Sequence, residues 1–168
     1  MAGKNKKKSK NDLISTNKTV VDNRRARRDY HLEETFTAGL MLLGTEVKSL
    51  RKGQCSINEA YCAEEDGVIV LHNAHIAEYM QAGKHLQHDP KRDRQLLLQK
   101  REIHRLLGAI SREGYTIVPL RLFFDDRGYA KLDIALGKGK KDYDKRETEK
   151  QRDWNKQKSR VVRDMGRD

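Results

Sequence analysis

The sequence has little of what secreted, redox-active or membrane-spanning proteins need. Of its 168 residues, two are cysteine, two are proline and one is tryptophan. Cys55 and Cys62 lie seven positions apart, without a C-x-x-C motif, which suits a reducing compartment and argues against a disulfide framework. No apolar run approaches the roughly 20 residues that cross a bilayer, and no hydrophobic stretch follows the lysine-rich start. We predict a soluble, cytoplasmic protein.

Motifs of catalysis and of metal binding are also missing. The sequence has no Gly-rich phosphate loop, no nucleophile elbow and no zinc-ligand pattern. Its nearest approach to a metal site is two pairs of histidines three residues apart, His72/His75 and His85/His88. Residues three apart in a strand face opposite sides, and structural zinc usually takes four ligands. We expect no metal and no cofactor.

Three carboxylates leave one enzyme class open. Asp125 and Asp126, with Asp133 nearby, could form the acidic site of an RNA-processing enzyme. Adjacent aspartates before Arg-Gly are more typical of a hairpin turn. We therefore predict that the protein is not an enzyme, and we keep the nuclease as the competing class.

What the sequence does have is positive charge at both ends. Residues 1–28 carry 10 Lys or Arg against 2 Asp or Glu, and residues 137–168 carry 12 against 7. The middle, residues 29–136, carries 14 against 16, within a total net charge of +11. A nearly neutral body between two basic ends is typical of a protein that binds a polyanion, here a nucleic acid. We divide the chain into a flexible arm (1–21), an RNA-binding body (22–136) and a tail (137–168).

The body reads as strands, two hairpins and helices. Period-2 alternation predicts a strand over residues 29–43, and turn residues predict hairpins over 60–73 and 115–136. We expect a short helix between Gly44 and Gly53 and a long helix over 89–114. Several short strands with one long helix between hairpins favour a mainly β fold, a small OB-like antiparallel barrel with helices.

The long predicted helix would carry two faces. At about 100° per residue, Arg94 and Arg101 fall on one side with two further arginines, and Leu96 and Leu107 fall on the other. Leu97 lies off the predicted core side. We interpret the arginine face as a contact surface, with a solvated face of local ion pairs as the alternative.

The tail contains the only tryptophan, Trp154, although it has too few apolar residues to form a core. Ordering each residue costs about 1–2 kcal/mol, so we expect the free tail to be disordered. As a helix it would align Trp154, Lys158 and Val161 in one narrow stripe, and the indole ring could stack on a base. We therefore predict a tail that becomes helical on its partner.

Five segments in order complete a pattern: "NRRARRDY", "GTEVKSLRKG", "DPKRDRQLLLQKREIHRLLG", "EGYTIVPLRLFF" and "GYAKLDIALGKGKKDYDKRE". In this order and spacing the chain resembles the SsrA-binding (small protein B) family, from about Asn23 to Trp154. The resemblance implies an OB-type barrel without enzyme activity. It also implies binding to the tRNA-like domain of transfer-messenger RNA and its delivery to stalled ribosomes. The tail would read the empty decoding centre and messenger channel.

The resemblance also assigns site residues. Family RNA contacts match Asn23, Leu97 and the Arg24, Arg25, Arg27 and Arg28 run, and Thr37 replaces an acidic family residue. To these we add Arg94 and Arg101. For the tail, the resemblance implies ribosome contacts at Gly139, Asp144, Lys145 and Arg146, and we add Lys138, Lys140, Lys141 and Trp154. The alternative is a ribosome-associated or ribosome-assembly factor that uses the same barrel.

Overall fold

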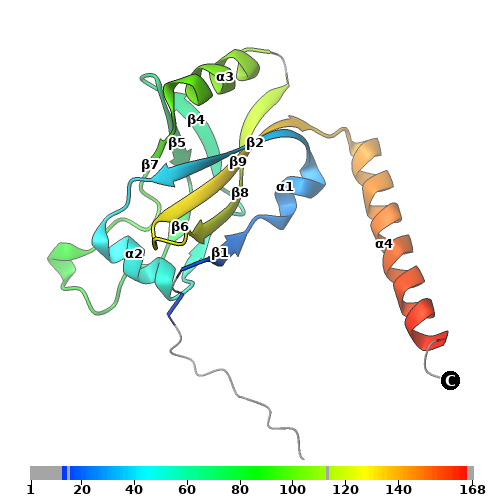
Figure 1. The fold of residues 1–168 in the computed structure, drawn as a ribbon, viewed down its shortest axis with the longest axis horizontal. Helices are drawn as coiled ribbons and strands as arrows, with labels where there is room; N and C mark the ends of the chain where they lie inside the picture. Colours follow the sequence, from blue (N-terminus) through cyan, green and yellow to red (C-terminus); the bar gives the residue numbers. More distant parts are fainter. Residues whose placement is uncertain (1–12, 15, 113, 166–168) are drawn as a thin grey trace, which may run out of the picture.

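The computed structural model describes residues 13–14, 16–112 and 114–165 and shows a mainly β fold with helices (Figure 1). The strands are β1 (Lys18–Asp22), β2 (Tyr30–Leu40), β3 (Cys55–Ser56), β4 (Tyr61–Glu65), β5 (Val68–His72), β6 (His75–Ile76), β7 (Arg94–Leu97), β8 (Tyr115–Phe124) and β9 (Ala130–Gly139). The helices are α1 (Arg24–Asp29), α2 (Gly44–Arg51), the short 3-10 helix η1 (Lys84–Leu86), α3 (Lys100–Ile110) and α4 (Asp142–Met165).

The strand pairings of the large sheet lead back to β8. The order is β1-β8-β4-β5-β7-β2-β9, and β9 also pairs with β8. Every pairing is antiparallel. β1 lies against Arg121–Phe124 of β8, whereas β4 meets β8 only where Cys62 pairs with Ile117. The edge of β8 between these two contacts faces the start of α1.

The period-2 strand and both hairpins are confirmed. In β2, Phe36, Ala38 and Leu40 are buried while the residues between them are more exposed. The hairpins are β4–β5 and β8–β9, as the turn residues predict. The buried residues of β9 include Leu132 and Ile134, which lie in the main core. Short helices close the core from both sides, because α2 contributes Leu50 and α3 contributes Leu106 from opposite ends of the strands (Figure 1).

The long helix predicted over 89–114 is wrong. Its first half is strand β7, which pairs with both β2 and β5, and α3 begins only at Lys100. Within β7, Arg94 and Leu96 are buried and Leu97 is 52% exposed. The arginines that we aligned on one helix face therefore belong to different elements, with Arg94 in strand β7 and Arg101 in helix α3.

Arg94 is buried because it has a buried partner. Its Nε donates to Glu46 Oε1 at 2.8 Å, and both side chains are 0% exposed. Arg92 Nη2 donates to the other Glu46 oxygen at 2.6 Å, and two more Arg94 bonds go to the Ala74 and Pro90 carbonyls. Burial alone would raise the pKa of Glu46, but the hydrogen bonds from Arg92 and the Leu43 amide, with Arg94 nearby, lower it below its ordinary value.

The boundary that we predicted between Leu136 and Gly137 falls inside β9. Gly137 pairs with Leu32 and Thr116, and Gly139 pairs with Tyr30. Gly137 and Gly139 are therefore strand residues. The tail therefore starts after β9, and residues 142–165 form α4, which extends away from the strands (Figure 1). Disorder of this segment in the free protein stays a prediction. Among the described residues no helix is long and apolar enough to cross a membrane.

Candidate nucleic-acid interface

Helix α1 presents four arginines to solvent. Arg24, Arg25, Arg27 and Arg28 are exposed, while Ala26 between them is 2% exposed. Ala26 packs with Val118, Leu120 and Ala135 in a small cluster on the outside of β8 and β9. This single apolar contact turns one side of the helix to the sheet and leaves the arginines outside.

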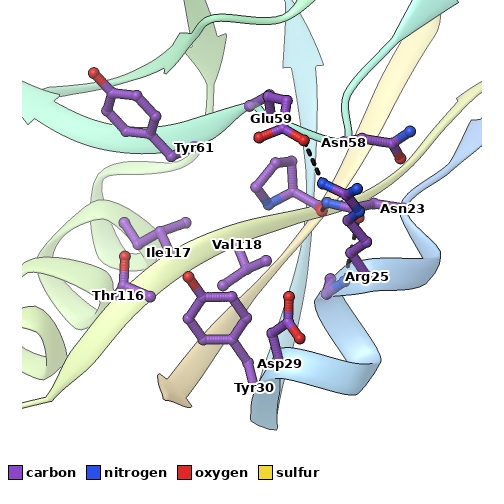
Figure 2. Close-up of a pocket in the computed structure, with 13 residues that line it drawn as sticks. Asn23, Arg25, Asp29, Tyr30, Asn58, Glu59, Tyr61, Thr116, Ile117 and Val118 are labelled. Atoms are coloured by element: carbon purple, nitrogen blue, oxygen red, sulfur yellow. Dashed lines mark hydrogen bonds and ion pairs between the residues drawn. The ribbon is translucent and has the colours of Figure 1, made fainter. Parts of the chain in front are cut away.

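Asn23 fixes the start of this helix. Its Oδ1 accepts from the Ala26 amide at 3.2 Å, and its Nδ2 donates to the carbonyls of Ile57 at 3.3 Å and Pro119 at 3.0 Å. Asn23 is 4% exposed. It lies among the residues that line the cleft in Figure 2. Asn23 thus caps α1 and joins it to β8 and to the loop before β4. Its side chain positions the neighbouring arginines, and contact of Asn23 with RNA stays a prediction.

Two of the arginines have acidic neighbours. Arg25 pairs with Glu59 across a cleft (Figure 2), and Arg28 Nε donates to Asp29 Oδ1 at 2.9 Å. Exposed ion pairs of this kind are worth about 0–1 kcal/mol. They orient the guanidinium groups without preventing an exchange of carboxylate for phosphate.

Thr37 and Leu97 share the outer face of the sheet. Thr37 Oγ1 donates to Asp133 Oδ1 at 2.7 Å. Gly39, two residues further along β2, lies under Leu97, because a Cβ on Gly39 would stand 3.3 Å from the Leu97 Cβ. The residues predicted from sequence to touch RNA at these two positions are therefore neighbours on one exposed surface.

The same face holds residues that sequence reasoning missed. Arg121 donates to Asp133 Oδ2 at 2.7 Å, and its guanidinium lies 4.6 Å from the centre of the Phe123 ring. Lys131 pairs with Gly39 in the register of β2 and β9. A single arginine inside the apolar run "VPLRLFF" was the signal, because a charged residue in a buried strand points to its exposed side.

The tail begins beside α1. The Lys140 amide donates to the Asp29 carbonyl at 2.9 Å, and Lys140 Nζ donates to the Arg27 carbonyl at 3.3 Å. His31 Nε2 lies 3.7 Å from Asp144 Oδ2 in the first turn of α4. Further along α4, Trp154 is 64% exposed. The tail's predicted ribosome-binding residues Lys138, Gly139, Lys141 and Arg146 are also exposed, and the side chain of Lys145 lies outside the described ones.

Comparison with known proteins identifies the family. The family described as "SmpB protein" matches residues 20–164. The chain is 56% identical over 150 residues to an SsrA-binding protein of Rhizobium etli (strain CIAT 652), which covers 89% of this chain and 94% of the relative. It is 54% identical over 149 residues to an SsrA-binding protein of Afipia carboxidovorans, with the same 89% and 94% coverage. The chain belongs to the SsrA-binding protein family.

A solved structure agrees with this assignment. It is described as "tmRNA-SmpB: a journey to the center of the bacterial ribosome", and its matching chain has a TM-score of 0.61 and 48% sequence identity. The match covers 73% of this chain and 85% of that chain. The family resemblance and the mainly β fold predicted from the sequence are both confirmed.

The two arginines that we added to the RNA contacts have different outcomes in this SsrA-binding family member. Arg94 cannot face a partner, because it is buried and paired with Glu46, so this prediction is wrong. Arg101 is exposed at the start of α3, a helix that lies apart from α1 (Figure 1). Its role in RNA binding stays a prediction.

Two of the three carboxylates of the competing enzyme class, Asp125 and Asp133, have structural partners in this SsrA-binding family member. Asp125 Oδ1 accepts from the amides of Arg127 at 3.0 Å and Tyr129 at 2.8 Å, which shapes the β8–β9 turn. Asp133 is held by Thr37 and Arg121 on the outer sheet face. Among the described residues no group of three or more His, Cys, Asp or Glu side chains is placed to hold a metal ion.

His88 is one of the four histidines considered as metal ligands, and it is buried. Its Nε2 lies 3.1 Å from the Ile76 carbonyl and its Nδ1 lies 2.9 Å from Thr45 Oγ1. A neutral ring that donates to the carbonyl and accepts from the hydroxyl satisfies both contacts. In this SsrA-binding family member His88 therefore joins the β6 region to α2.

Proposed function

We propose that this chain binds the tRNA-like domain of transfer-messenger RNA and delivers it to stalled ribosomes for trans-translation. Its membership in a family named for binding SsrA supports this, as does the likeness to a chain from a tmRNA–SmpB ribosome structure. The protein acts in the cytoplasm as an adaptor without catalysis of its own.

The observation that carries the proposal is the arrangement of α1. Four exposed arginines stand on a helix that a buried asparagine fixes to the body. Arginine guanidinium groups bind phosphates through paired donors, and a fixed scaffold reduces the entropy lost on binding. Thr37, Leu97 and Arg121 add a hydroxyl, an apolar side chain and a cation on the outer sheet face. The arginines can therefore contact the RNA backbone, and the residues on the outer sheet face can contact a base or a ribose.

We propose three functional parts. The basic arm, predicted over residues 1–21, ends before β1 at Lys18, because β1 belongs to the sheet; residues 1–12 and 15 lie outside the described ones. The body is an OB-like barrel that extends to the end of β9 at Gly139, and the strand pairings that return from β9 to β8 support the barrel. The remaining residues form the tail.

The tail's proposed task is on the ribosome. It enters the decoding centre and the messenger channel, where Lys141, Asp144, Lys145 and Arg146 meet ribosomal RNA and Trp154 stacks on a base. Exposure of Trp154 along a helix that extends away from the strands supports this role (Figure 1).

The experiment is to recover the affinity-tagged full chain from its own cell lysate and sequence the RNA that comes with it. Transfer-messenger RNA should dominate. The variant with Arg24, Arg25, Arg27 and Arg28 all changed to alanine should recover much less of it. If these arginines meet about three phosphates, the log–log salt dependence of binding should become shallower by roughly 2–3 units. Recovery of mainly ribosomal RNA would favour a ribosome-assembly factor instead.

A further inference from the structure

A polar cleft lies between α1 and the strand edge formed by β4 and β8. Its volume is about 260 Å³, and its walls include Arg25, Asp29, Tyr30, Glu59 and Tyr61 (Figure 2). That volume equals about nine waters at roughly 30 Å³ each in the liquid. Drug-sized ligands occupy roughly 300–1,000 Å³. The cleft therefore suits a single ring system.

The cleft exists because the β-ladder is interrupted here. β4 pairs with β8 at Ile117, and β1 pairs with β8 from Arg121 onward. Between them, the amide and side chain of Asn23 bond to the Leu120 and Pro119 carbonyls in place of a strand. The opening is thus built into the fold and held in place by a buried side chain.

At the rim of the cleft stands an oriented aromatic ring, Tyr61, which points away from Asp29 and Tyr30 (Figure 2). Tyr61 is 53% exposed, and its ring stacks against His72 with the ring centres 5.1 Å apart and an interplanar angle of 21°. His72 is itself fixed, because Asp93 Oδ1 lies 2.8 Å from its Nδ1 and Glu65 Oε1 lies 3.3 Å from its Nε2. A ring held in this way offers its remaining face to a partner without losing further rotamer freedom.

The charged groups of the cleft are two carboxylates and one cation. Asp29 receives Arg28 on one carboxylate oxygen, and Glu59 receives Arg25 on one carboxylate oxygen. The second oxygen of each carboxylate can accept a hydrogen bond from a ligand. Arg25 lies at the mouth of the cleft, next to the arginines proposed to meet phosphates (Figure 2).

We propose that the cleft binds one unstacked base of the partner RNA, and that the base carries an exocyclic amino group. The base would stack on Tyr61 at the rim and donate its amino hydrogens to Glu59, while Arg25 turns to the adjoining phosphate. Single-stranded RNA is read in this manner, by stacking on aromatic rings and hydrogen bonds to base edges. Adenine, cytosine and guanine have the amino group, and uracil lacks it. This inference rests on the proposed function, since it places a nucleotide of the same RNA.

The test uses the full chain and the tRNA-like domain of transfer-messenger RNA made by transcription. Tyr61→Leu should weaken binding about tenfold, the range expected for loss of one base–aromatic stack. Tyr61→Phe should keep near-normal affinity, because the ring remains. The matched control is Tyr129→Leu, which removes a still more exposed tyrosine from the β8–β9 turn. Thermal melting of all three variants shows that the fold is kept.

Zero-length ultraviolet crosslinking with mass spectrometry identifies the base. A crosslink at Tyr61 or Tyr30 to adenosine, cytidine or guanosine is expected, and changing that nucleotide to uridine should weaken binding. If the wild type binds the RNA tightly and Tyr61→Leu binds it equally well, the cleft proposal is overturned and the proposed function survives. A crosslink to uridine in the cleft overturns the amino-group requirement. If the wild type does not bind this RNA, the proposed function itself has failed.

Discussion

At the scale of single residues, Gly137 is the first residue of the predicted tail, but packing inside β9 requires a glycine there. A Cβ at this position would stand 3.0 Å from Val118 Cγ2 and 3.2 Å from the Tyr30 Cβ. We expect Gly137→Ala to lower the free energy of unfolding by about 1–3 kcal/mol, the usual cost of overpacking. The control is Gly139→Ala, where nothing lies within 4 Å. Urea denaturation measures both, and equal stability would mean that Val118 and Tyr30 give way.

Glu46 predicts how stability depends on pH. Because the folded state lowers the pKa of Glu46, the unfolded chain binds its proton more readily, and stability must fall as pH falls. The contribution is fully present above the unfolded pKa, about 4.3, and is lost as pH drops toward the folded pKa. Urea denaturation between about pH 7 and pH 3 should show this loss.

The variant Glu46→Gln separates this residue from the other carboxylates. It should remove its share of the acid loss and cost about 3–5 kcal/mol at neutral pH, because Arg94 would remain buried without a charged partner. Glu147→Gln, an exposed change on α4, should leave both stability and the pH profile unaltered. A Glu46→Gln protein as stable as the wild type would contradict the buried pair.

At the scale of elements, Leu96 and Leu97 test the strand β7. Leu96 is 2% exposed and faces the core, whereas Leu97 faces the outer surface beside Gly39. We expect Leu97→Asp to fold normally and to lose affinity for the tRNA-like RNA by roughly tenfold or more. Leu96→Asp would bury an unpaired charge and should unfold the domain. Circular dichroism and filter binding measure the two properties, and unfolding of both variants would refute the assignment of their faces.

The elements that the sequence predicts well are those whose pattern is local. In β2, buried and exposed residues alternate along the strand, and turn residues between β-prone runs indicate each hairpin. β7 is different, because "RQLL" is a strand only through its pairing with β2 and β5 and through the Glu46 partner of Arg94. These contacts join positions far apart in the chain, and no periodicity reveals them. The site divides in the same way: the α1 arginines could be found from sequence, Arg121 had a signal that we missed, and the Asn23 cap and the cleft could not be found.

At the scale of the whole molecule, body and tail should separate binding from action on the ribosome. Ending the chain after Lys141 keeps β9 whole and removes nine Lys or Arg and seven Asp or Glu. Because the proposed RNA contacts lie on α1 and the outer sheet face, we expect near-normal affinity for the tRNA-like RNA. Rescue of ribosomes stalled on a message without a stop codon should be lost in a reconstituted translation assay. A truncated protein that still rescues would overturn the tail's proposed role.

The final prediction distinguishes specific tail contacts from simple charge. Asp144→Arg, Lys145→Asp and Arg146→Lys together permute one acidic and two basic residues and keep the net charge, so a purely electrostatic tail should tolerate them. A tail that makes fixed contacts should not, because each donor and acceptor must stay in place. Asp144→Arg also breaks the contact with His31, and His31→Gln alone is therefore the matched control. We expect the triple variant to bind the tRNA-like RNA normally and to lose rescue, while His31→Gln keeps both. If both the triple variant and His31→Gln lose rescue, the cause is loss of the His31–Asp144 contact between the body and α4.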